Sequence, residues 1–182
     1  MRLRLGEVPF HRCLDAEPFQ HLAGATLPLA SARLKLEPDD YRAHLDLANL
    51  LTAARHPDGT AFPDYISQAK PHLDFLKDKQ PNNPETHQAW ASYYEAQNKT
   101  GEAIQEAQQT ISLDPNRSES YLFLALLQLR ADQADQAEVN FKKAIAVDPK
   151  SLNAVLALGG FYQSHNRFPE AEQQFKQAIQ ID

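Results

Sequence analysis

The residues that could bind a metal or act as nucleophiles do not occur in the patterns that such chemistry requires. The seven histidines form no HExxH motif, and the single cysteine, Cys13, lies two residues from His11 with no second pair at zinc spacing. Gly159 and Gly160 stand alone inside a helical pattern and form no phosphate-binding loop. No serine lies in a nucleophile elbow. We therefore expect no metal site, no cofactor and no enzymatic activity in this chain.

The composition excludes several classes of partner and compartment. The chain of 182 residues carries 18 basic and 24 acidic side chains, and its net charge of -6 argues against nucleic acid as the main ligand. No apolar run approaches the roughly 18 residues expected of a transmembrane segment. The N-terminus has two arginines but no apolar core of a secretory signal. A lone cysteine forms no internal disulfide, so the compartment stays open between cytoplasm and periplasm.

What the chain does carry is a regular repeat. Three sets of identical residues recur every 34 positions: Ala69, Ala103, Ala137 and Ala171; Pro81, Pro115 and Pro149; and Ile111, Ile145 and Ile179. A fixed period in this range is typical of repeat architectures, in which each repeat packs on its neighbours. Such arrays mostly present surfaces to partner proteins.

Each repeat contains two apolar runs at helical spacing. The first run is marked by Trp90 with Tyr94, by Leu124 with Gln128, and by Leu158 and Gly159 with Tyr162. In the second run, small alanines recur, and they let two helices approach while aromatic residues fill the space between them. Helix starts are predicted at Asn83-Pro84, at Asn116 with Glu119 as a capping box, and at Phe168-Pro169. Helix ends are predicted at Asp114-Pro115 and Asp148-Pro149.

This pattern resembles the tetratricopeptide repeat (TPR) family, whose helix–turn–helix units have this period and these small, aromatic and proline signatures. The resemblance is specific from Pro84 to Asp182. It implies an all-α fold, a right-handed superhelical solenoid of antiparallel helix pairs, with repeats over 84–117, 118–151 and 152–182. A further repeat over 41–83 carries a loop insertion near 55–63, and residues 1–40 are expected to form an irregular or degenerate N-terminal helical segment.

Two places depart from the regular pattern near the N-terminus. Pro71 lies where the second helix of the repeat 41–83 should run, so we expect a kink there or a helix that begins late. Upstream, Phe10, Cys13 and Leu14 occupy core positions of a degenerate repeat, and a helix is expected from Leu29 to Glu37. This segment is interpreted as a worn or capping repeat.

The stretch from Ser120 to Arg130 contains more apolar residues than one packed face needs. Leu122, Leu126 and Leu129 share a second face, which in the TPR family lines the concave groove that holds a peptide or a partner's helix. One interpretation is an apolar peptide-binding strip. The alternative is burial under the inserted loop with Phe62 and Tyr65, or under a segment outside the chain.

The resemblance places Gly159 at a close helix contact, while Gly160 is interpreted as a tolerated local defect, with an opening of the inner surface as the alternative. It also places a set of residues on this inner face. The predicted partner-binding groove consists of Arg42, Asn49, Gln88, Ser92, Glu95, Leu122, Leu126, Leu129, Arg130, Asn153 and Leu156. The family's chaperone-tail binders use lysine, asparagine and arginine there to clamp a terminal carboxylate, and this set lacks such a basic clamp. We therefore expect no binding of acidic EEVD-type tails.

The sequence thus predicts a protein–protein interaction module that binds a peptide or helix in its concave groove. The chain is expected to be part of a longer TPR protein. The even spacing of its last three repeats is taken to indicate a bacterial source. Two alternatives stay open: a structural spacer or self-association element, in which a second copy is the partner, and the accessory domain of an enzyme whose catalytic part lies elsewhere. The identity of the partner is not encoded in any motif.

Overall fold

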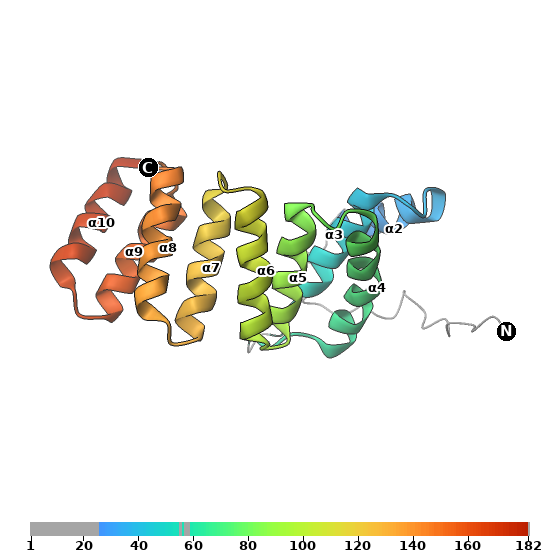
Figure 1. Ribbon diagram of the computed structural model, residues 1–182, viewed down its shortest axis with the longest axis horizontal. Helices are drawn as coiled ribbons and strands as arrows, with labels where there is room; N and C mark the ends of the chain where they lie inside the picture. The colour runs from blue at the N-terminus through green and yellow to red at the C-terminus, as the bar shows by residue number, and fades with distance from the viewer. Residues whose placement is uncertain (1–25, 55, 57–58, 182) are drawn as a thin grey trace. The chain divides into compact units, whose positions relative to one another are not determined.

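The computed structural model describes residues 26–54, 56 and 59–181, and these residues form nine helices (Figure 1). The helices are α2 (Thr26–Leu36), α3 (Tyr41–Ala53), α4 (Pro63–Lys79), α5 (Pro84–Ala96), α6 (Thr100–Leu113), α7 (Ser118–Arg130), α8 (Ala134–Val147), α9 (Leu152–Ser164) and α10 (Phe168–Ile181). The prediction of an all-α fold of helix pairs is confirmed. The expectations for Phe10, Cys13 and Leu14 lie outside the described residues.

The chain divides into two compact units, residues 1–79 and residues 80–182, which are called here the first and the second unit. The described part of the first unit contains α2, α3 and α4, with α3 packed against both of the others. The second unit consists of three helix pairs, α5 with α6, α7 with α8 and α9 with α10, and successive pairs also pack on each other.

The core of the second unit is built as the repeat predicts. Ala103, Ala137 and Phe141 are completely buried, and Ala171 is nearly so. Phe141 is the largest fully buried side chain among the described residues, and it belongs to a core cluster with Ala125 of α7, Phe161 of α9 and Ala171 of α10. The apolar residues that recur at helical spacing in the sequence are thus the residues that are buried in this unit.

The turns between paired helices repeat as well. Asn98, Asp132 and Asn166 are spaced 34 residues apart and have φ of 58°, 56° and 58°. Asparagine and aspartate tolerate this left-handed conformation better than other residues with a Cβ atom, so these polar residues suit the turn at the end of each first helix.

Most of the predicted helix boundaries are confirmed. The Asn83 side chain accepts a hydrogen bond of 2.8 Å from the backbone N–H of Glu85, and α10 begins at Phe168. Helices α6 and α8 end immediately before Asp114 and Asp148. The capping box at Asn116 and Glu119 is wrong, because α7 starts one residue later than such a box requires. Arg117 occupies the cap position without a side-chain hydrogen bond, and the Asn116 backbone N–H instead donates to Asp114 at 3.2 Å.

The first unit shows how the irregular repeat is accommodated. Helix α4 begins at Pro63 and contains Pro71 inside it, so of the two alternatives the late start is wrong and the kink stays a prediction. Pro71 has no N–H to donate to the carbonyl of Ser67 one turn earlier, and both residues are exposed. Helix α2 begins at Thr26, three residues before the predicted Leu29, and ends at Leu36.

Candidate functional site

The first helices of the last two repeats expose leucines that their core does not need. On α7, Leu124 and Leu127 are buried, whereas Leu126 keeps 44% of its surface exposed. On α9, Leu156 is 43% exposed, while Leu158 is buried. Helices α7 and α9 contact each other directly. Leu156 is one repeat after Leu122, and Leu126 is one helical turn after Leu122, so these leucines lie on corresponding faces of α7 and α9. This face of α5, α7 and α9 is called the inner face below.

Leu122 and Leu129, the other two surplus leucines of α7, are half-buried. Both pack against the cluster that contains Phe161 and Tyr162 of α9. These two leucines are therefore partly buried, as the alternative interpretation expects. The helix that covers them is α9 of the next repeat and not the inserted loop. Phe62 of the inserted loop packs instead on Tyr65 of its own unit, with ring centroids 4.9 Å apart. Leu126 is the surplus leucine of α7 that remains exposed.

An ion pair borders the exposed leucines. Arg130, one turn after Leu126 on α7, bonds to the carboxylate of Glu95 on α5. The Arg130 side chain is 60% exposed and that of Glu95 only 17%, so the pair lies at the surface with its acidic end sheltered. Exposed pairs of this kind contribute about 0–1 kcal/mol to stability. The pair lies one helical turn from Leu126.

The remaining predicted groove residues are polar and fall into two groups. In the second unit, Gln88 and Ser92 on α5 are half-buried, and the Ser92 hydroxyl donates to the Gln88 carbonyl at 3.1 Å. Asn153 is exposed in the first turn of α9. In the first unit, Arg42 pairs with Asp46 at 3.2 Å on α3, and Asn49 is exposed. The structure thus gathers nine of the predicted residues on α5, α7 and α9 of one unit, and it places Arg42 and Asn49 in the other.

The two adjacent glycines of α9 differ sharply in their surroundings. A Cβ atom on Gly159 would lie 2.6 Å from Cε1 of Phe175, so this glycine allows α9 and α10 to approach, as predicted. A Cβ on Gly160 would meet nothing within 4 Å. Gly160 is exposed and lies one repeat after Leu126, so it leaves open space on the inner face where α7 carries a leucine. The sequence alone favoured a tolerated defect at this position.

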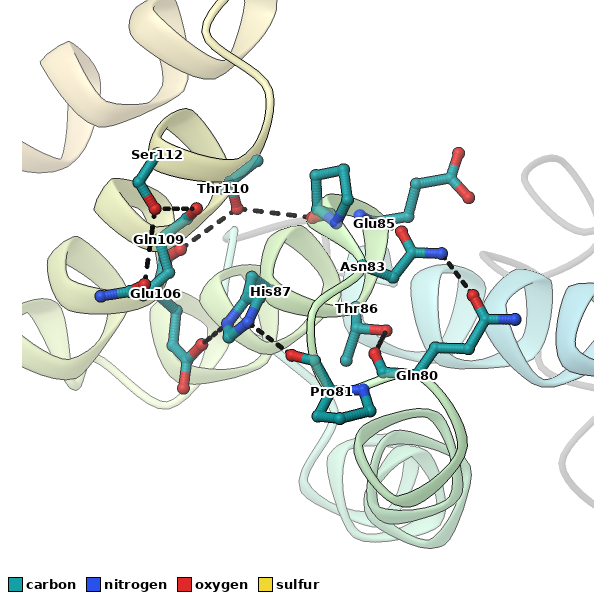
Figure 2. A network of polar contacts seen from close by, with 11 residues as sticks. Gln80, Pro81, Asn83, Glu85, Thr86, His87, Glu106, Gln109, Thr110 and Ser112 are labelled. Carbon is teal, nitrogen blue, oxygen red and sulfur yellow. Dashed lines mark hydrogen bonds and ion pairs between the residues drawn. The ribbon is translucent and has the colours of Figure 1, made fainter.

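The histidines of the described chain are engaged in structural contacts. His87 directs Nε2 at the carbonyl of Pro81, at 2.9 Å, and Nδ1 at the carboxylate of Glu106, at 2.5 Å (Figure 2). Both ring nitrogens of His87 therefore face oxygen atoms of other residues. His44 makes the same contact with Pro38, at 3.0 Å. Among the described residues, no group of three or more histidine, cysteine, aspartate or glutamate side chains is arranged to hold a metal ion.

His72 pairs with His44 through their Nδ1 atoms, which lie 2.8 Å apart. Burial lowers the pKa of His72 to about 4, and the charge of a protonated His44 acts in the same direction. The Pro38 carbonyl can only accept, so Nε2 of His44 donates to it; when both rings are neutral, Nδ1 of His44 then accepts from Nδ1 of His72. This contact holds α3 against α4.

Glu138 is the centre of a polar cluster that ties α8 to α9 and to the turn before α10. Its carboxylate accepts from Tyr162 at 3.1 Å, from Arg167 at 2.7 Å and from Lys142 at 2.7 Å. Burial raises the pKa of Glu138, but the hydrogen bonds from Lys142, Arg167 and Tyr162 outweigh it and bring the pKa to about 2. The cluster links α8, α9 and the turn before α10 through one carboxylate that accepts from three donors.

The comparisons with known proteins agree with this architecture. The model of the family described as "Tetratricopeptide repeat" matches residues 128–182. No curated protein sequence matches the chain. Within the part of the chain that the structure describes, no helix is long and apolar enough to cross a membrane.

Several solved structures share the fold at low sequence identity. TTC0263, a thermophilic TPR protein in Thermus thermophilus, has a TM-score of 0.69 and 19% identity over 85% of this chain and 80% of that one. MamA has a TM-score of 0.66 and 19% identity over 85% of each chain. YrrB, described as a TPR protein with an unusual peptide-binding site, has a TM-score of 0.60 and 16% identity over 86% of this chain and 76% of its own. The prediction of a TPR helical-repeat fold is confirmed.

Proposed function

We propose that this tetratricopeptide repeat chain is a protein-interaction module, and that the inner face of α5, α7 and α9 holds an extended segment or a helix of a partner protein. The observation that carries the proposal is the exposure of Leu126 and Leu156 on two adjacent first helices. Neither leucine is needed by the core, since each of these helices already buries its own set of apolar residues. Exposed apolar side chains gathered on one face are a signature of partner binding.

The surface has the features of a preformed apolar site with polar edges. An aliphatic or aromatic side chain of the partner would cover Leu126 and Leu156 and reach into the open space over Gly160. Burying one leucine side chain fully yields about 1.5–3 kcal/mol before ordering costs are subtracted. The Glu95–Arg130 pair on one side and Asn153 on the other would set the register of the bound segment.

Two further considerations define the kind of ligand. The inner-face residues of α5 and α9 include no lysine or arginine, and Arg130 is already paired, so a basic clamp for a C-terminal carboxylate is missing. The peptide-binding site in the description of YrrB supports peptide recognition by a related fold. We propose no catalytic role for the described part of the chain, in which His44, His72 and His87 and the low-pKa carboxylate of Glu138 are engaged in structural bonds.

Affinity capture from a source lysate tests the proposal, with the wild-type chain and Leu126→Glu as baits. Val139→Glu is the matched control, since Val139 lies on the second helix α8 and is 52% exposed. A partner that is captured by wild type and by Val139→Glu but lost with Leu126→Glu would support the inner face as the site. Identical captures by all three baits would refute it. A mass corresponding to two copies in place of a partner would favour self-association.

A further inference from the structure

An acidic side chain stands at one end of the exposed leucines on the inner face. Glu119 lies in the first turn of α7, one turn before Leu122 and two turns before Leu126, so the three residues share one face of the helix. Glu119 is exposed. Its carboxylate forms no ion pair and no hydrogen bond with any other residue that the structure describes. A charge therefore borders the apolar surface without a basic side chain of the described chain beside it.

The opposite end of the same surface shows how a carboxylate is matched there. Arg130, one turn after Leu126, bonds to Glu95 of α5. Glu95 thus has a basic partner within the chain, and its side chain is only 17% exposed. Glu119 differs from Glu95 in both respects, so it is available to a basic group that comes from outside the described chain.

The charges around this face are mostly of one sign. Helices α5, α7 and α9 contain the glutamates Glu85, Glu95 and Glu119, and Arg130 is the one lysine or arginine of these three described helices. The second unit as a whole carries thirteen acidic and eight basic residues. A second copy of the chain would bring the same excess of negative charge, which disfavours it as the occupant. A basic segment of another protein is complementary to this face.

We infer that the inner face binds a partner segment in which a lysine or arginine accompanies a large apolar side chain. The inference rests on the proposed function and adds the charge of the ligand to it. The basic side chain pairs with Glu119, and the apolar one covers Leu126 and the open space over Gly160. Glu119 and Leu126 are seven residues apart, which is about 10 Å along α7. The two ligand residues are therefore about three positions apart in an extended segment and about seven in a helix.

A phage-displayed library of random peptides, selected on the full chain, is the probe. Enriched peptides should carry a lysine or arginine at this spacing from a large aliphatic or aromatic residue. Fluorescence anisotropy with a labelled copy of an enriched peptide should show that Glu119→Gln weakens binding about two- to fivefold and Glu119→Lys about tenfold. At an ionic strength of about 1 M, where charges are screened beyond about 3 Å, wild type and Glu119→Gln should differ less. The matched control is Glu102→Lys, which reverses an exposed charge in the first turn of the second helix α6 and should bind like wild type.

Exchange of the two charges gives the decisive comparison. A peptide whose basic residue is replaced by glutamate should bind wild type weakly and should bind Glu119→Lys better than the original peptide does. Enriched peptides without an excess of basic residues, or equal binding by wild type, Glu119→Gln and Glu119→Lys, would overturn the inference. If such peptides still lose binding to Leu126→Glu, the proposed function stands and only the charge of its ligand is wrong. If no enriched peptide depends on Leu126, the proposed function fails and this inference fails with it.

Discussion

The neighbouring glycines of α9 give the sharpest test of the packing, because the same substitution should have opposite effects at the two positions. Alanine is more favourable than glycine inside a helix by about 0.8–1 kcal/mol. At Gly160 nothing opposes this gain, since an added Cβ meets no atom within 4 Å. At Gly159 an added Cβ would lie 2.6 Å from Cε1 and 3.0 Å from Cδ1 of Phe175, so the ring must move. Overpacking of this kind costs about 1–3 kcal/mol.

We therefore expect Gly160→Ala to stabilise the chain by roughly 0.5–1 kcal/mol and Gly159→Ala to destabilise it by roughly 0–2 kcal/mol. Urea denaturation followed by circular dichroism measures both values. Phe175→Leu provides an internal control, because a smaller side chain at that place should reduce the difference between the two alanine variants. Equal free energies of unfolding for Gly159→Ala and Gly160→Ala would refute the close approach of α9 to α10.

Three further predictions concern the core and the buried titratable groups. Phe141→Ala removes a fully buried ring and should cost about 3–5 kcal/mol in urea denaturation, with failure to fold as the extreme result. Glu138→Gln weakens the bonds from its three donors and should lower the free energy of unfolding by about 1–3 kcal/mol. The pKa of the folded Glu138 carboxyl is about 2, below its usual 4.5, so the stability that this carboxylate contributes is lost as pH falls from 4.5 towards 2. In Glu138→Gln, the free energy of unfolding should therefore fall less over this pH range than in wild type. The pKa of His72, about 4, lies below the usual 6.5, so the stability that neutral His72 contributes to the first unit is present above pH 6.5 and is lost as pH falls towards 4. In His72→Gln, the urea midpoint should depend less on pH over this range.

The repeat pattern was sufficient to predict most of the helices because most of their boundaries depend on local chemistry. Asp114 and Asp148 precede prolines that disfavour the helical region, and α6 and α8 end immediately before them. The prediction of a capping box at Asn116 was wrong because α7 starts at Ser118, one residue later than the box requires. Helix α7 starts at Ser118, whose hydroxyl donates to the carbonyl of Ala144 at 2.9 Å. That contact is 26 residues away in the chain, so the residues around Asn116 do not show it.

The surface was harder to predict, since burial there depends on neighbours that a single helix does not reveal. Leu122, Leu126 and Leu129 look alike in the sequence, but α9 covers two of them in part and leaves Leu126 exposed. Gly160 was interpreted as a defect because glycine has a low helix propensity. The sequence does not show the open space beside this residue. The roles of His87 and His44 were also hidden, because each depends on a backbone carbonyl of the preceding turn.

The central claim is that a partner lies on the inner face, and site-specific photocrosslinking tests it most directly. A photoreactive residue is placed at Leu126 in one variant and at Val139, on the second helix α8, in another, and both are irradiated in source lysate. The account predicts a defined crosslinked protein from position 126, with no matching product from position 139. The same product from both positions, or a product from position 139 alone, would contradict it.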